Sequence, residues 1–280
     1  MAQIINTNLI SLNAQRNLAG SHDMLARSVQ RLSTGQRINS ARDDAAGLAI
    51  AERMNTRIRG ANAAIRNASD GISLLQTAEG AMARISDMGQ RMRELAVQSA
   101  NATNSDTDRA ALNEEYQALG TEIKRLIEGT EFNGIRVLGQ GIALDFQVGA
   151  DAGDQIEVIL QGQLGRTHFS HVVGNNTATP PPPISSADGA RDALGKLDRM
   201  LNESNSVRAE FGVLQNRFEA IIQTLQIEAE NHAAARSRIM DADFARESAA
   251  LTRAQVLQQA GTAMLTQANA LPNNVLSLLR

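Results

Sequence analysis

A run of apolar residues with helical spacing, from Met54 to Leu95, constrains the fold of this 280-residue chain more than any other feature. The apolar positions recur every three or four residues, and no proline interrupts them. At a rise of about 1.5 Å per residue, the run predicts a single helix about 60 Å long. Asp43 and Asp44 precede it, so both are candidates for the residue that caps the N-terminus of this helix.

Four further segments show the same spacing. One ends at Thr34-Gly35, one covers about 109–128, one covers about 190–239, and the last reaches almost to the C-terminus. Because chain ends are usually polar, apolar stripes at both ends of the chain indicate a packing partner. The N-terminal stripe consists of Ile5, Leu9, Leu12, Leu18, Leu25, Val29 and Leu32. The C-terminal stripe consists of Ala250, Ala254, Leu257, Gly261, Met264, Ala268 and Leu271, and Val275, Leu276, Leu278 and Leu279 follow Pro272.

The middle of the chain has a different pattern. Residues 143–148 and 156–160 alternate between apolar and polar side chains and are flanked by glycine-rich turns, which predicts β-hairpins. The stretch "RTHFSHVVGNNTATPPPPISSADG" contains four consecutive prolines and is predicted to be an exposed connection. The predicted fold is therefore mainly α, a long antiparallel helical bundle or coiled coil formed by the N- and C-terminal halves, with a small β-hairpin region at the tip.

Composition excludes several classes of protein. The chain has no Cys, which rules out disulfides and Cys-based zinc or redox sites. The formal net charge of −3 argues against general nucleic-acid binding. No apolar run approaches the roughly 18 residues of a membrane span, and the N-terminus lacks the basic and apolar regions of a secretory signal.

The residues that could carry chemistry favour structural roles. His168 and His171 have a spacing compatible with a metal pair, but no acidic partner lies nearby, so we expect two solvent-facing loop histidines. His232 lies on an apolar stripe and is expected to pack in a helix seam. Asp43 and Asp44 fit capping better than general acid–base work. We therefore predict no catalytic, cofactor-binding or metal site, and no enzyme.

Six stretches in order resemble bacterial flagellin over roughly residues 1–160 and 187–280. They are "MAQIINTNLISLNAQRNL", "RLSTGQRINSARDDAAGLAIAERM", "QRMRELAVQSANATNSDTDR", "EFNGIRVL", "QNRFEAIIQTL" and the C-terminal tail. The segment from about 161 to 186 matches nothing in that family and falls where flagellins carry variable outer domains. The chain therefore resembles a short form that lacks large outer domains.

The resemblance implies a structural subunit that polymerises into the flagellar filament for swimming motility. It implies an inner helical domain of residues 1–43 and 236–280. The outer part is then residues 44–186, with hairpins and a reduced loop at 161–186, and a return helix at 187–235. The implied partners are copies of the chain, the flagellar export apparatus with a secretion chaperone, and the filament cap and hook-junction proteins. The implied location is the extracellular filament, reached without a cleaved signal peptide. The residues expected to carry polymerisation are Ile5, Leu9, Leu12, Leu257, Met264, Leu271, Val275, Leu276, Leu278 and Leu279.

The stretch "QRMRELAVQ" adds an expectation about hosts. In flagellins similar to this chain it forms a helical patch recognised by the flagellin-sensing Toll-like receptor, and the matching residues are Gln90, Arg91, Leu95, Gln98 and Glu115. Arg91, Leu95 and Gln98 have 4-3 spacing, which predicts one shared helical face. The alternative is that this face contacts a neighbouring subunit, and both uses can hold.

A coiled-coil scaffold or nucleic-acid-associated protein is the alternative function. Residues 1–100 contain twelve Arg against eight acidic residues, a modest basic excess. These arginines alternate with acids and lack aromatic partners for base stacking, which favours a solvated or intersubunit polar face. Sedimentation distinguishes the two, because a flagellin pellets as filaments without added nucleic acid.

Overall fold

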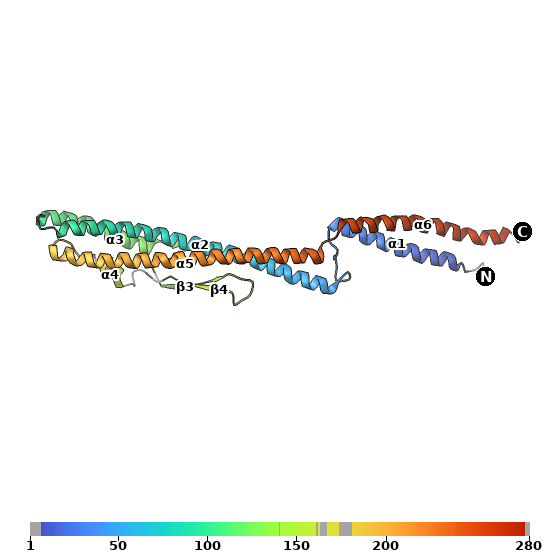
Figure 1. Ribbon diagram of the computed structural model, residues 1–280, viewed down its shortest axis with the longest axis horizontal. Coiled ribbons are helices and arrows are strands. Elements are labelled where there is room, and N and C mark those ends of the chain that lie inside the picture. The colour runs from blue at the N-terminus through green and yellow to red at the C-terminus, as the bar shows by residue number, and fades with distance from the viewer. Residues whose placement is uncertain (1–6, 140, 161, 163–166, 174–180, 278–280) are drawn as a thin grey trace. The chain divides into compact units, whose positions relative to one another are not determined.

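The computed structural model describes residues 7–139, 141–160, 162, 167–173 and 181–277. The chain divides into a terminal unit of residues 1–58 and 230–280, and a middle unit of residues 59–229. Their borders lie inside two long helices, at different residues from the 43/44 and 235/236 borders that the resemblance implied. The elements are α1 (Leu9–Thr34), α2 (Ala45–Ala100), α3 (Asp106–Gly129), β1 (Glu131–Phe132), β2 (Ile135–Arg136), β3 (Ile142–Gln147), β4 (Gln155–Leu160), α4 (Thr167–Val173), α5 (Ala187–Met240) and α6 (Phe244–Ser277) (Figure 1).

Local side chains fix the helix ends. Helix α1 ends where Gly35 adopts a left-handed conformation with φ of 69°, which confirms the predicted stop. At the start of α2, the Asp44 carboxylate accepts a hydrogen bond of 2.8 Å from the Gly47 amide, so the predicted cap is confirmed for this residue. The prediction is wrong for Asp43. Its carboxylate accepts from the hydroxyl and amide of Ser40 instead, which lowers the pKa of Asp43 and closes the turn before the helix.

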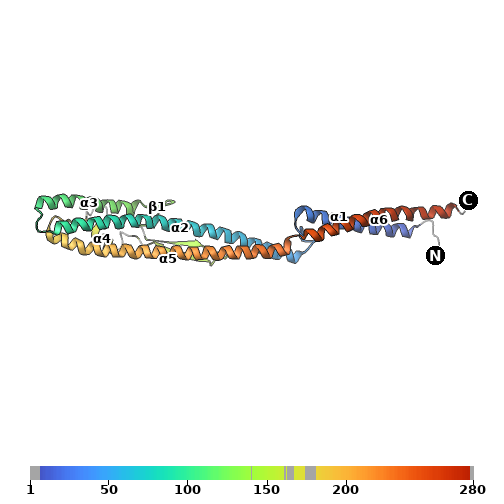
Figure 2. The ribbon, with the colours of Figure 1, turned by 45° about the horizontal axis from the view of Figure 1, so that its top comes forward.

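The middle unit is built on the antiparallel packing of α2 against α5. The Phe218 ring lies against Gly71, and the hydroxyls of Ser86 and Ser204 are 2.7 Å apart. Figures 1 and 2 show α3 running beside this pair. The three helices enclose large, fully buried side chains, which confirms a mainly α fold of long packed helices. They include Leu75, Met82, Ile85, Met92, Leu95, Tyr116, Ile123 and Ile127.

Two hairpins confirm the predicted strands. Between β1 and β2, Asn133 and Gly134 have φ of 47° and 79°, the positive values required at both central residues of a tight hairpin turn. Strands β3 and β4 pair antiparallel over six residues each, and β4 buries every second side chain. The sequence had led us to expect this hairpin at the tip of the helical bundle, and that placement was wrong. The hairpin instead packs along the side of the helices. The Phe146 ring of β3 contacts Phe218 of α5 with 5.5 Å between ring centroids.

The connection before α5 is less exposed than predicted. Helix α4 buries Phe169, Val172 and Val173 in the core of the middle unit. The backbone of Ile184 forms two hydrogen bonds. Its amide donates to the Oδ1 of Asn113, and its carbonyl accepts from the buried Ser99 hydroxyl. The described part of this segment is therefore anchored in the core by Phe169, Val172, Val173 and Ile184, and the prediction of an exposed connection was wrong for these residues.

Close packing at Gly71 leads to a stability prediction. A Cβ at this position would lie 2.9 Å from the Cζ of Phe218, a fully buried ring. A Cβ at Gly195, an exposed position within α5, would have nothing within 4 Å. We expect Gly71→Ala to be less stable than Gly195→Ala by about 1–3 kcal/mol, because only the first change overpacks a core. Equal stabilities in urea denaturation would contradict this account.

Candidate functional site

Helices α1 and α6 pack antiparallel in the terminal unit. The Asn8 side-chain amide donates to the carbonyl of Ala268 at 2.8 Å, and at the other end Arg31 forms a 2.9 Å ion pair with Glu247. Figures 1 and 2 show the two helices side by side. The two terminal helices therefore pack against each other within one chain.

The most buried positions of the seam between α1 and α6 are small residues, and half-buried leucines such as Leu18 and Leu251 lie between them. Among the described residues of the two helices, the buried ones are Ser11, Ser21, Ser28, Ala254 and Ala268. At Gly261 the helices are so close that a Cβ would lie 3.2 Å from Leu18. Small side chains allow this close approach, but they remove little apolar area from water and so contribute little stabilisation.

The seam of α6 is rotated relative to the predicted stripe. Ala254, Gly261 and Ala268 lie in it as expected, and the half-buried Leu251 and Leu265 complete it. Three other members of the predicted stripe lie outside the seam. Ala250 is exposed, and Leu257 and Met264 retain exposed fractions of 45% and 62%.

Large apolar side chains consequently remain in contact with water. Of the fourteen exposed large apolar side chains in the described part of the chain, nine belong to α1 and α6, and we call these nine the terminal apolar surface. They are Leu9, Ile10, Leu12, Met24, Val29, Phe244, Val256, Leu257 and Met264. A concentration of this kind is typical of an interaction site.

Four of the residues predicted to carry polymerisation belong to this surface, namely Leu9, Leu12, Leu257 and Met264. Residues Ile5, Leu278 and Leu279, and the side chains of Leu271, Val275 and Leu276, lie outside the described part of the structure.

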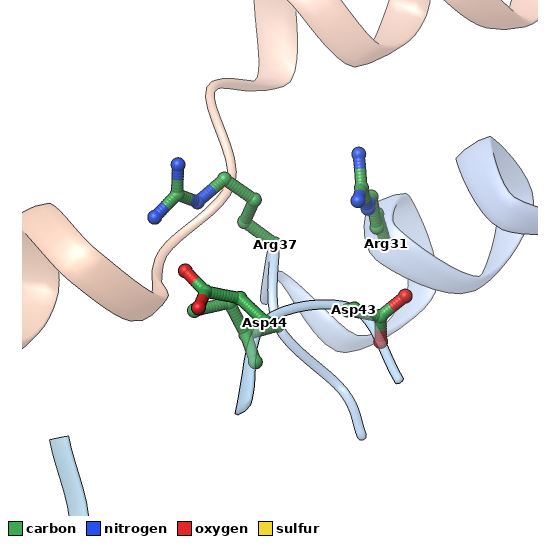
Figure 3. Close-up of a pocket in the computed structure, with 5 residues that line it drawn as sticks. Arg31, Arg37, Asp43 and Asp44 are labelled. Atoms are coloured by element: carbon green, nitrogen blue, oxygen red, sulfur yellow. The ribbon is translucent and has the colours of Figure 1, made fainter. Parts of the chain in front are cut away.

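A polar pocket lies where the chain passes from α1 to α2. Figure 3 shows Arg31, Arg37, Asp43 and Asp44 around it, and Ile38 completes its lining. Arg37 donates two hydrogen bonds, of 2.7 and 3.2 Å, to the carbonyl of Ile239, and its own amide donates to the carbonyl of Met240. The charged groups of the pocket therefore hold the connection between α1 and α2 in place.

The predicted receptor-recognition residues do not all share an exposed face. Arg91 forms ion pairs with Glu115 of α3 at 2.8 Å and with Glu94 at 3.0 Å, and these contacts raise the pKa of Arg91. Gln90 and Gln98 are exposed. Leu95 is only 1% exposed and belongs to the core, so its predicted place on the exposed face was wrong. It faces inward because α2 packs against α3 and α5 at once and buries a wide stripe.

The histidines lie on helices. His168 and His171 are on α4, with 6.4 Å between ring centroids, and His232 is half-buried on α5. The part of the chain that the structure describes contains no group of three or more potential metal ligands. None of its described helices is long and apolar enough to cross a membrane.

Comparison with known proteins now identifies the family. The model of the bacterial flagellin N-terminal helical region matches residues 5–142, and that of the bacterial flagellin C-terminal helical region matches residues 194–279. The flagellin of Halalkalibacterium halodurans is 44% identical over 99% of this chain and 100% of its own length. Flagellin E of Vibrio cholerae is 35% identical over the full length of both chains. The crystal structure of Bacillus cereus flagellin is 32% identical, with a TM-score of 0.50 over 61% of this chain and 94% of that one.

The chain belongs to the bacterial flagellin family, the structural proteins that form the flagellar filament.

The weak seam of the terminal unit leads to a prediction for the monomer. Brief trypsin digestion should cut first at exposed arginines of α1 and α6, such as Arg16 and Arg253, because local opening of this helix pair exposes little apolar area. Arg84 is also exposed but lies on α2 in the middle unit, so it should be cut later. Mass spectrometry of the earliest fragments checks the order. Simultaneous cleavage at Arg84 and Arg16 would show that the terminal unit is no weaker.

Proposed function

We propose that this chain polymerises into the extracellular flagellar filament for swimming motility, through packing of its terminal helices against those of other copies. The observation that carries the proposal is the terminal apolar surface. The family supports the wider setting, in which the flagellar export apparatus and a secretion chaperone handle the subunit, and cap and hook-junction proteins meet the filament ends.

The energetics favour contact with several neighbours. Full burial of a large apolar side chain contributes about 1.5–3 kcal/mol, so covering the exposed half of one contributes about 1 kcal/mol. The nine side chains of the terminal apolar surface together contribute on the order of 10 kcal/mol. Association itself costs about 4–15 kcal/mol in lost freedom of motion. Because the gain from covering all nine side chains is close to this cost, a copy is held firmly only where neighbours cover most of the surface.

Substitutions on this surface test the proposal. Leu257→Asp and Met264→Asp should each raise the monomer concentration needed for growth on filament seeds by about tenfold or more, because a carboxylate cannot be buried unpaired. The matched control is Ile159→Asp, which changes a 57% exposed side chain on β4. Deleting "NVLSLLR" should also impair polymerisation. Sedimentation and electron microscopy measure the polymer, and circular dichroism checks that the monomers are folded. Normal growth of both α6 variants would overturn the proposal.

We further propose that the free monomer is recognised by the flagellin-sensing Toll-like receptor of hosts. The observation that favours this function is the exposed ion pair between Arg91 and Glu115, which joins α2 to α3 beside the exposed Gln90 and Gln98. Arginine is enriched among the residues that contribute most to binding at protein interfaces.

The receptor proposal is tested with Arg91→Ala and Gln98→Ala. Loss of the arginine anchor should reduce receptor signalling by about tenfold or more, and loss of Gln98 should reduce it less. Arg125→Ala is the control, because Arg125 is exposed on α3 and forms a similar ion pair with Glu122. Leu95→Ala is unsuitable, since it would open a cavity in the core and destabilise the protein by about 2–5 kcal/mol. Unchanged signalling by folded Arg91→Ala would contradict recognition at this surface.

A further inference from the structure

Two methionines in the described part of the chain are exposed, and both belong to the terminal apolar surface. The chain has nine methionines, of which Met1 lies outside the described residues. Met24 and Met264 have exposed fractions of 43% and 62%. The remaining described methionines are buried or half-buried, namely Met54, Met82, Met88, Met92, Met200 and Met240. The described thioethers that a small solute reaches most easily in the monomer are therefore concentrated on the surface that we propose for assembly.

Met24 and Met264 lie at the edge of the α1–α6 seam. Met24 follows the buried Ser21 by three residues, and Met264 follows Gly261 of the seam by the same step. Three residues rotate a helix by about 300°, so each methionine lies about 60° around its helix from the seam residue. Because the helices are antiparallel, equal rotations place both side chains on the same side of the pair. Since Gly261 is level with Leu18, the two methionines are about 14 Å apart along the pair, within reach of a single neighbouring copy.

The methionine thioethers are the groups of this chain that a peroxide oxidises most readily, because the chain has no Cys. With hydrogen peroxide, a sulfur lone pair forms an S–O bond as the O–O bond breaks. The transferred hydroxyl group then loses its proton to the departing hydroxide, which leaves as water. The sulfur is oxidised by two electrons and the peroxide is reduced by two. The product, methionine sulfoxide, is polar, whereas the thioether is apolar.

We infer that Met24 and Met264 form an oxidation site that controls assembly, because a peroxide converts them to sulfoxides in the free subunit and so keeps that subunit out of the polymer. This inference rests on the proposed function and adds a regulation of the same surface. The other seven members of the terminal apolar surface are Leu, Ile, Val and Phe residues, which hydrogen peroxide leaves unchanged. A sulfoxide that is buried against apolar neighbours loses its hydrogen bonds to water without replacement, and such burial is unfavourable.

The seam itself should survive oxidation. Its described members on α6 include Ala254, Gly261 and Ala268 with the half-buried Leu251 and Leu265, and none of these residues is a methionine. The oxidised subunit should therefore keep the pairing of α1 with α6 while its affinity for other copies falls. In the polymer, neighbouring copies cover both thioethers, so oxidation should act on free subunits and spare those already assembled.

The experiment compares the unmodified protein with the double variant Met24→Leu/Met264→Leu. Monomers are treated with hydrogen peroxide until peptide mass spectrometry shows oxidation of Met24 and Met264 but not of Met82 and Met92, and the peroxide is then removed. The treated unmodified protein should need a monomer concentration about tenfold higher or more for growth on filament seeds. Leucine is close to methionine in volume and is not oxidised. The untreated double variant should therefore stay within about threefold of the unmodified protein, and treatment should change it by less than about twofold.

Two controls separate these methionines from the others. Met54→Leu/Met88→Leu removes two half-buried methionines of α2, and this variant should lose assembly on treatment as the unmodified protein does. Methionine sulfoxide reductases, one for each sulfoxide epimer, should restore the growth of the treated unmodified protein, and this arm needs no substitution. Filaments formed before treatment should keep Met24 and Met264 unoxidised, as peptide mass spectrometry measures.

Three results would overturn the inference. The first is growth of oxidised monomers on seeds at the concentration that untreated monomers need. The second is inhibition of the Met24→Leu/Met264→Leu variant by peroxide as strong as that of the unmodified protein. The third is equal oxidation of the two methionines in filaments and in monomers. Failure of the untreated, unmodified protein to grow on seeds would instead refute the proposed function.

Discussion

The terminal unit depends on which side chains lie between α1 and α6. Small residues occupy the buried positions between the two helices, and large apolar residues face solvent. The most buried positions of the seam between these helices are serine and alanine, with only half-buried leucines between them, so the helices come close and stabilise each other weakly. The large apolar side chains that a stable two-helix hairpin would bury, such as Leu257 and Met264, lie outside the seam. The hydrophobic stabilisation of the terminal unit is therefore available mainly to contacts with other molecules. In a filament-forming family, the simplest such molecules are further copies of the chain.

In the middle unit, by contrast, the large apolar side chains are buried within a single copy. Its helices bury Tyr116, Phe169, Phe218 and many aliphatic side chains, and α4 and the β3–β4 hairpin close the remaining sides of the core. We expect it to hold its shape in the monomer even when the terminal helices open. This difference suits a subunit that folds in part before assembly and gains the rest of its stability within the polymer.

The sequence predicted the helices well because long apolar periodicity is a strong signal. The sequence predicted less well which face of each helix is buried. The predicted stripe of α6 and the observed seam share Ala254, Gly261 and Ala268. They differ in the residues between these, which are Ala250, Leu257 and Met264 in the predicted stripe and the next residues along the chain, Leu251, Gln258 and Leu265, in the seam. Because Ala254, Gly261 and Ala268 belong to both rows, the spacing of apolar residues alone cannot show which row packs against α1. Leu95 shows the same difficulty, since its spacing from Arg91 suggested an exposed face while contact with two helices at once buries it. The place of the β3–β4 hairpin depended on contacts between residues distant in sequence, such as Phe146 with Phe218, and no local pattern reports those.

The central claim is that the apolar side chains outside the α1–α6 seam are covered by neighbouring copies. A high-resolution cryo-electron microscopy structure of the filament measures this directly, through the exposed areas of Leu9, Leu12, Leu257 and Met264. The account predicts that all four become buried against other subunits while the seam of Ala254, Gly261 and Ala268 keeps its contacts with α1 of the same chain. Filaments in which Leu257 and Met264 still face solvent would contradict it.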